Sequence, residues 1–217
     1  MKVKVVTRIL EANERIATEN RRLFKEKGLF VVNLMSGPGA GKTSLLVRTI
    51  ELLKPHLRVG VIEGDITGTE DAERIQSTGV PVVQINTGGA CHLDANMIQE
   101  VLPELPLGEL DLLFIENVGN LVCPAEFNVG EDMKVMLLSV TEGEDKPLKY
   151  PLMFQQSKAL VINKIDLLPH LDIDMESLKE RARALNRDME IFEVSCKTSE
   201  GLESWTTYLT GLINSTH

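Results

Sequence analysis

The sequence lacks the features of an exported, disulfide-bonded or membrane-spanning protein. No apolar run approaches the roughly 20 residues needed to cross a bilayer. The opening stretch MKVKVVTRILEANERIATEN is charged throughout and has no apolar centre of signal-peptide length. Cysteines occur only at positions 91, 123 and 196, too few and too odd in number for a disulfide framework. We therefore expect a cytoplasmic protein whose cysteines are core residues, metal ligands or reactive thiols.

Basic side chains are also scarce. The 23 lysines and arginines are outnumbered by 32 acidic residues, and the net charge is −9. This charge repels phosphate backbones and anionic lipid, and no local basic patch offsets it, so we expect neither nucleic acid nor a membrane surface as a partner. The hydrophobic fraction of 43% over 217 residues is sufficient for one substantial core.

Short apolar runs, separated by segments with helical periodicity, fill most of the chain. The runs cover residues 30–35, 58–65, 80–86, 111–117, 134–140, 158–164 and 190–196. The helical segments cover residues 43–54, 69–78, 93–105, 174–187 and 201–213. Apolar runs of this kind suit strands that are buried on both faces. The pattern predicts an α/β fold with three layers, a mostly parallel sheet covered by helices on both faces.

The domain organisation predicted from these patterns is simple. Residues 1–28 form an N-terminal amphipathic helix packed on the domain, with the helical pattern running over 4–27 and Gly28 as its stop. Residues 29–217 form a single domain, because no internal repeat, low-complexity tract or linker interrupts them.

A phosphate-binding loop follows the first apolar run. The segment SGPGAGKTSLL, residues 36–46, lies between a predicted strand and a predicted helix, where backbone N–H groups and the helix start can bind phosphate. Lys42 is expected to reach the β and γ phosphates, and the Thr43 hydroxyl to bind Mg²⁺. The predicted nucleotide contacts here are Gly37, Gly39, Ala40, Gly41, Lys42, Thr43 and Ser44.

Two carboxylates are predicted at the strand ends that face this loop. Asp65 is the last residue of the run RVGVIEGD, and Glu116 is the last but one of DLLFIEN. Carboxylates at these ends lie on the ligand edge of an open α/β sheet, so both are candidate Mg²⁺ ligands. The alternative is that each is an ordinary charged residue at the start of a loop, with no role in binding. For catalysis, we expect Asp65 to orient the attacking water, and Lys42 with Mg²⁺ to stabilise the transition-state charge.

The bound base is predicted to be guanine. The tetrapeptide NKID, residues 163–166, follows a buried run, and the Asp166 carboxylate can accept hydrogen bonds from N1–H and the exocyclic amine of guanine. Adenine offers no matching pair of donors. Residues Ser195, Cys196 and Lys197 resemble the Ser-Ala-Lys element that also contacts guanine in GTPases, and Asn163 and Lys164 complete the predicted base site.

A second, softer metal site is predicted at the same edge. Cys91 and His92 follow one strand and Cys123 lies shortly beyond another, so thiolate and imidazole ligands suited to Zn²⁺ or Ni²⁺ converge. Glycines 88–89 permit the irregular backbone by which neighbouring residues can bind one ion, and Asp94 can cap the helix that follows. The alternative is a buried cysteine beside a histidine at a helix start.

The sequence resembles the HypB family of GTPases, accessory proteins for nickel insertion into [NiFe] hydrogenase. The segments that carry this resemblance are GPGAGKTSLL, EGDI, GGACHLDA, the long stretch from FIENVGNLVCPAEF to EGEDKPLKYP, and VINKIDLL. The resemblance implies a P-loop fold of the SIMIBI class and a GTP-dependent homodimer. It also implies nickel or zinc bound by Cys91, His92 and Cys123 at the subunit interface. The implied partners are a HypA-type metallochaperone and the hydrogenase large subunit precursor.

The sequence also suggests a hypothesis: the nucleotide site and the nickel or zinc site are coupled, because their predicted residues lie close together in the chain. Cys123 lies seven residues after Glu116, so loss of the γ phosphate could move a metal ligand. Relatives in the wider class carry a second lysine in the phosphate loop that reaches across the dimer. Here residues 37–40 are Gly-Pro-Gly-Ala, so Lys146 or Lys149 is the candidate for that role; a solvated loop charge is the alternative.

The sequence is also compatible with three rival functions. The closest is a GTPase that inserts nickel into urease. A P-loop small-molecule kinase with a structural zinc is a second rival, since a phosphate loop alone does not separate hydrolysis from transfer, although NKID argues against it. A non-catalytic nickel buffer, in which GTP is only a conformational ligand, is the third.

Overall fold

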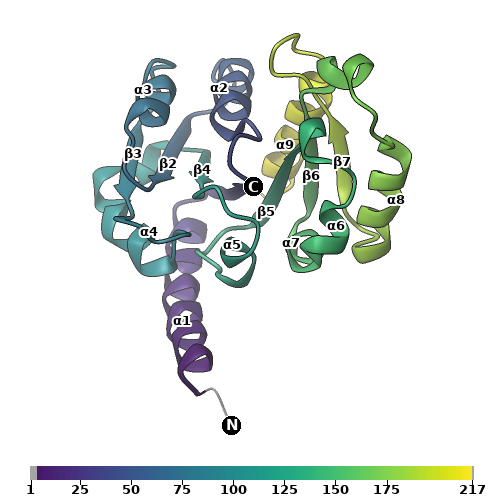
Figure 1. Ribbon diagram of the computed structural model, residues 1–217. Helices are drawn as coiled ribbons and strands as arrows, with labels where there is room; N and C mark the ends of the chain where they lie inside the picture. Colours follow the sequence, from purple (N-terminus) through teal and green to yellow (C-terminus); the bar gives the residue numbers. More distant parts are fainter. Residues whose placement is uncertain (1–3, 217) are drawn as a thin grey trace.

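The structure, a computed structural model, describes residues 4–216 (Figure 1). The first three residues of the predicted N-terminal segment and residue 217 lie outside the described part. Over residues 4–216, none of the helices is both long enough and apolar enough to traverse a bilayer.

The centre of the fold is a seven-stranded sheet in which every described pair of neighbouring strands is parallel. Its strands are β1 (Phe30–Ser36), β2 (Val59–Asp65), β3 (Val82–Asn86), β4 (Leu112–Glu116), β5 (Met133–Ser139), β6 (Ala159–Asn163) and β7 (Glu190–Glu193). Their spatial order is β3-β2-β4-β1-β5-β6-β7. All seven predicted strands are therefore confirmed, and the carboxyl ends of parallel strands place the loops that follow them on one edge.

Helices cover both faces of this sheet. They are α1 (Lys4–Glu26), α2 (Lys42–Leu53), α3 (Glu70–Gln76), α4 (Ala95–Val101), α5 (Cys123–Glu126), α6 (Lys146–Lys149), α7 (Pro151–Gln156), α8 (Met175–Leu185) and α9 (Leu202–Thr216). Short 3₁₀ helices span Leu102–Glu104, Leu107–Glu109, Val140–Glu142 and Ile165–His170. Strand β1 shows how the layers form: Val32 packs in the core beneath α2 and α9, while its neighbour Val31 packs on the other face, beside α1 and α4. The three-layer prediction is confirmed.

Some helix predictions need correction. The segment predicted as one helix over 93–105 begins at Ala95 and changes to 3₁₀ geometry at Leu102, where Pro103 interrupts the α-helical pattern. Helices α5, α6 and α7 were not predicted, because segments of four to six residues are too short to show periodicity. Each of them has a proline in its first turn, a position that proline favours.

Helix α1 packs against α4 and extends beyond the sheet at the bottom of Figure 1. Gly28, with φ of 66°, ends it as predicted. The N–H of Leu29 donates to the Phe24 carbonyl at 2.9 Å, and the N–H of Gly28 donates to the Lys25 carbonyl at 3.1 Å. These two hydrogen bonds form a Schellman motif at the C-terminus of the helix. Phe24 is buried in the core, so the C-terminal half of α1 is part of the fold.

Candidate functional site

The phosphate loop has the predicted strand–loop–helix geometry. It leaves β1 at Ser36 and enters α2 at Lys42. Gly41, with φ of 100°, lies directly before the helix, and a Cβ there would meet Asn163 Nδ2 at 2.6 Å, so only glycine fits. Lys42 Nζ donates to the Ser36 hydroxyl at 3.1 Å. The loop therefore presents backbone donors and an ammonium group at a helix start, the arrangement that binds phosphate.

Two adjoining cavities surround this loop. One, of about 300 Å³, is lined by Gly39, Gly41, Lys42, Thr43, Ser44, Asp71, Arg74, Glu116 and Lys164. The other, of about 360 Å³, is lined by Gly41, Ser44, Asn163, Lys164, Asp166, Leu167, Cys196 and Lys197. They share three lining residues, so together they form one hollow, with a predicted phosphate end at Lys42 and a predicted base end at Asp166. Gly37 and Ala40 belong to the same loop but do not line either cavity.

Thr43 and Glu116 meet at the phosphate end. The Thr43 hydroxyl donates to Glu116 Oε1 at 2.9 Å. Glu116 is buried, and its Oε2 has no hydrogen-bond partner among residues 4–216. Burial raises the pKa of Glu116 to about 7, while the nearby Lys42 charge opposes the rise. A buried carboxylate oxygen without a partner fits a divalent cation, so these residues suit the predicted Mg²⁺ role.

Glu63 is a second buried carboxylate beside Glu116 that was not predicted from the sequence. It pairs in register with Glu116 across strands β2 and β4 and is buried, and its Oε2 also has no hydrogen-bond partner in the described chain. Burial, followed by the charge of Glu116, raises the pKa of Glu63 to about 8. The available signal was a charged residue inside an otherwise apolar strand, RVGVIEGD.

Asp65 lies at the end of β2, as predicted, but outside the residues that line the phosphate cavity. Its carboxylate accepts backbone hydrogen bonds from Ile66 at 2.6 Å and Gly68 at 3.0 Å. Arg74 of α3 lines the cavity instead and donates to the Ser44 hydroxyl at 3.0 Å. Nothing in the sequence distinguishes Arg74 from an ordinary charged helix residue. The catalytic and Mg²⁺ roles of Asp65 therefore stay predictions.

The base end is joined directly to the phosphate loop. Asn163 Nδ2 donates to the Ala40 carbonyl at 3.0 Å, and Lys164 Nζ donates to the Gly39 carbonyl at 2.7 Å. Lys164 has φ of 64°, a left-handed conformation that few residues other than glycine adopt. NKID thus fixes the loop as well as lining the base cavity.

The second segment predicted to contact guanine, Ser195 to Lys197, also reaches this end. Ser195 donates from its hydroxyl to Asp166 Oδ1 at 2.6 Å, and the N–H of Cys196 donates to Asn163 Oδ1 at 3.3 Å. Burial raises the pKa of the Cys196 thiol to about 11. The thiol is therefore neutral, consistent with a small packing residue, and Lys197 lines the cavity beside it.

The three residues predicted to bind nickel or zinc lie close together, as expected. Cys91 Sγ lies 3.1 Å from Cys123 Sγ and 3.6 Å from His92 Nδ1, and the ligand atoms of all three residues lie within 4.8 Å of one another. Glycines 88 and 89, with φ of 60° and 111°, supply the irregular backbone. Asp94 accepts from the Met97 N–H at 2.8 Å and caps α4, which leaves the Cys-His pair on the loop.

Protonation of this cluster depends on its surroundings. The hydrogen bond with Cys91 and partial burial raise the pKa of the Cys123 thiol to about 11. Burial lowers the pKa of His92, which favours the neutral imidazole that binds metals. The His92 ring also packs on Phe127, with centroids 4.0 Å apart, a contact that the sequence did not indicate.

The loop after β5 runs beside the phosphate loop. A Cβ on Gly37 would meet Glu142 Oε2 at 2.9 Å, and Lys146 Nζ lies 3.9 Å from the same carboxylate oxygen. Lys149 pairs with Asp145 at 2.5 Å. Both candidate lysines thus have partners within their own chain, and a role across a dimer stays a prediction.

Known proteins match both the sequence and the fold. Residues 30–193 match the family model for the CobW/HypB/UreG nucleotide-binding domain. The chain is 56% identical to the hydrogenase maturation factor HypB of Azotobacter vinelandii over 201 residues, 93% of this chain and 66% of the relative. It is 41% identical to the hydrogenase/urease maturation factor HypB of Helicobacter hepaticus, over 92% of this chain and 84% of that protein. The chain spans about two thirds of the Azotobacter protein.

A solved structure supports the same likeness. The crystal structure of HypB from Helicobacter pylori in complex with nickel superposes with a TM-score of 0.89 at 38% identity, over 94% of this chain and 96% of that one. This match confirms the predicted P-loop fold.

Proposed function

Because the chain belongs to the HypB group of the CobW/HypB/UreG family, we propose that it is a GTP-hydrolysing metallochaperone that helps to insert nickel into the [NiFe] hydrogenase large subunit. The observation that carries this proposal is the cluster of Cys91, His92 and Cys123, whose ligand atoms lie within 4.8 Å of one another. Thiolate and imidazole ligands suit Ni²⁺ and Zn²⁺ alike. Nickel is the cargo of the site, and zinc competes for the same ligands.

The nucleotide site supports GTP as the ligand. The Asp166 carboxylate, oriented by the Ser195 hydroxyl, accepts the guanine N1–H and amine hydrogens. Lys42 neutralises the β and γ phosphates, and Thr43 and Glu116 hold Mg²⁺, which supplies charge stabilisation when bound. Asp65, at the end of β2, orients the attacking water.

Nucleotide state and cargo are coupled through the segment between Glu116 and Cys123. GTP orders this segment and favours a homodimer that captures nickel, with Lys146 or Lys149 reaching the partner's nucleotide. Hydrolysis relaxes the segment and releases nickel toward a HypA-type metallochaperone and the large subunit precursor. The proximity of Gly119 to the phosphate loop supports this coupling: a Cβ there would meet Pro38 Cα at 3.2 Å.

Nickel binding combined with gel filtration tests the proposal. Wild type, Cys123→Ser and His92→Asn are compared with Mg²⁺ plus GDP and with Mg²⁺ plus a non-hydrolysable GTP analogue. The analogue should drive dimerisation and change nickel affinity, and both substitutions should abolish tight nickel binding. His56→Asn is the matched control, since His56 is exposed and lies outside the cluster. Nickel binding that ignores nucleotide and survives both substitutions would refute the proposal.

Nickel insertion into urease is the second candidate, favoured by the name of the Helicobacter hepaticus relative. The same ligand cluster would serve either enzyme. Capture of the tagged, analogue-bound protein with purified hydrogenase and urease accessory proteins separates the two, since binding to the urease set alone would reassign the target.

A further inference from the structure

A buried ion pair lies behind the nickel cluster. Lys134, in β5, and Glu131, just before it, are 5% and 7% exposed, and Lys134 Nζ lies 3.7 Å from Glu131 Oε1. Burial lowers the pKa of Lys134, and the Glu131 charge opposes this change. Neither side chain lines the nucleotide cavities or belongs to the metal cluster. Buried charges are costly, so this pair needs a structural or functional explanation.

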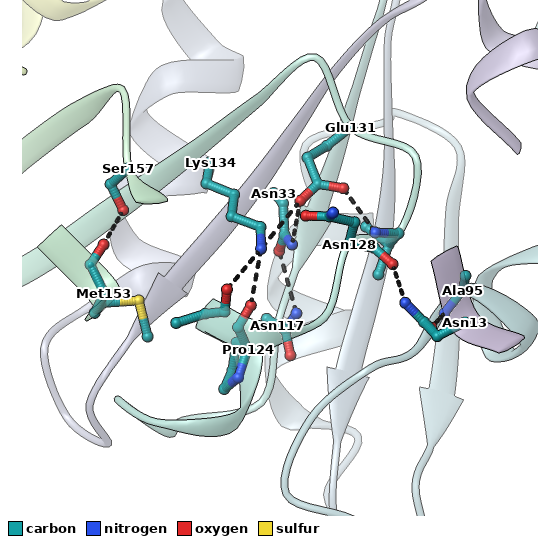
Figure 2. Close-up of polar contacts among 12 residues, drawn as sticks. Asn13, Asn33, Ala95, Asn117, Pro124, Asn128, Glu131, Lys134, Met153 and Ser157 are labelled. Carbon is teal, nitrogen blue, oxygen red and sulfur yellow. Dashed lines mark hydrogen bonds and ion pairs between the residues drawn. The ribbon is translucent and has the colours of Figure 1, made fainter. Parts of the chain in front are cut away.

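The ammonium group reaches the helix that carries Cys123. Lys134 Nζ donates to the carbonyls of Pro124 at 3.3 Å and Ala125 at 3.0 Å, the two residues that follow this cysteine (Figure 2). Helix α5 has only four residues, so its carbonyls gain almost no hydrogen bonds within the helix. Lys134 supplies the donors that these carbonyls lack, and it thereby fixes the backbone next to Cys123.

The other end of the network reaches the Cys91–His92 loop. Glu131 Oε1 accepts from Asn33 Nδ2 at 3.4 Å, and Asn33 Oδ1 accepts from Asn117 Nδ2 at 3.2 Å (Figure 2). Asn117 Oδ1 in turn accepts from the N–H of Leu93, the residue after His92, at 3.0 Å. Asn117 also directly follows Glu116, so one continuous set of buried contacts touches both metal loops and the end of β4.

We propose that Lys134 is a positioning residue for nickel binding. With Glu131, Asn33 and Asn117 it holds the Cys123 helix at a fixed place relative to the Cys91–His92 loop. The inference rests on the proposed function, because it assigns a role toward that same metal site. Side chains behind a metal site that orient its ligands commonly change metal affinity 10- to 100-fold when they are replaced, roughly the effect expected here.

The test uses the paired substitution Lys134→Met with Glu131→Gln. Removing both charges together avoids leaving one buried charge unpaired, so the fold should survive. Nickel affinity and the thiolate-to-nickel charge-transfer absorption are measured beside GDP affinity. We expect nickel affinity to fall about 10- to 100-fold, with a changed absorption band and unchanged GDP affinity. Lys158→Met is the matched control: its backbone N–H pairs with the Lys134 carbonyl at 2.9 Å, but its side chain is exposed.

The outcomes separate this inference from the proposed function. Unchanged nickel affinity and absorption in the folded double variant overturn the inference and leave the proposed function standing. Absence of the nickel–thiolate band in wild type overturns the proposed function itself. If the double variant does not fold, Lys134→Met alone is measured. It removes the donor to the Pro124 and Ala125 carbonyls, while Glu131 keeps its hydrogen bonds from Asn33 Nδ2 and the Val129 N–H. Nickel affinity equal to wild type then overturns the inference.

Discussion

The Thr43 hydroxyl and the Glu116 carboxylate are joined by a hydrogen bond of 2.9 Å, although 73 residues separate them in the chain. Through this contact the first turn of α2 is tied to the end of β4. The second carboxylate oxygen of Glu116 is left without a protein partner among residues 4–216. If this pair binds Mg²⁺, as proposed, its side chains already lie together and need little reorganisation on binding.

Glu116→Gln should weaken the dependence of GDP affinity on Mg²⁺. The amide keeps the size of the side chain but removes the charge that attracts the cation, so GDP affinity in Mg²⁺ should fall about 10- to 100-fold. In EDTA, wild type and variant should bind GDP equally, which is the internal control. Titrations with a fluorescent GDP analogue measure both conditions. A variant whose Mg²⁺ dependence equals that of wild type would remove Glu116 from the cation site.

Asp166→Asn should change the preferred base from guanine to xanthine. The substitution replaces one carboxylate acceptor with an amide donor, which no longer matches the guanine amine but matches the carbonyl of xanthine at that position. GDP affinity should fall about 100-fold or more, because a buried donor would face another donor. Xanthosine diphosphate should gain affinity in the same titration. Loss of both nucleotides would indicate damage to the loop, through the contact with Ser195, and would not support a base-reading role.

The sequence predicted the strands, the phosphate loop and the clustering of Cys91, His92 and Cys123 because each has a local pattern. The loop 36–46 has fixed spacing, and Cys91 and Cys123 are two of only three cysteines. Glu63 was missed because its partner, Glu116, is a neighbour only through strand pairing. The contacts of Lys134 likewise depend on where β5 lies relative to α5. Such pairings are set by tertiary packing, which no short sequence window contains.

Nickel affinity should rise with pH. The Cys123 thiol, whose pKa is raised to about 11 first by its hydrogen bond with Cys91, is protonated in the free protein at neutral pH. Nickel binds the thiolate, so binding must expel this proton, and affinity should increase at least tenfold for each pH unit between about 6 and 9. The lowered pKa of His92 adds no further proton near neutrality. Calorimetry in buffers of different ionisation enthalpy measures the released protons, and a flat affinity profile would contradict these ligands.

Glu63 should make the stability of the cation-free protein depend on pH. Its pKa is about 8 in the folded state, raised mainly by burial, against about 4.3 for an unfolded glutamate. Between these values the folded state binds more protons than the unfolded state, so the free energy of unfolding falls as pH rises. Glu63→Gln removes this dependence. Relative to the variant, wild type should lose about 4 kcal/mol between pH 4.5 and pH 8.

Urea unfolding in EDTA measures this difference, with fluorescence of the single, buried Trp205 as the probe. The slopes of the free energy of unfolding against pH are compared, because the effect of the amide at position 63 on stability is the same at every pH and cancels. Saturating Mg²⁺ with GDP provides the decisive control, because a cation held beside Glu116 would stabilise the ionised form of Glu63 and flatten the wild-type slope. Parallel pH profiles for wild type and variant in EDTA would show that Glu63 ionises normally in the folded protein. A wild-type slope that Mg²⁺ with GDP leaves unchanged would place Glu63 outside the influence of the cation.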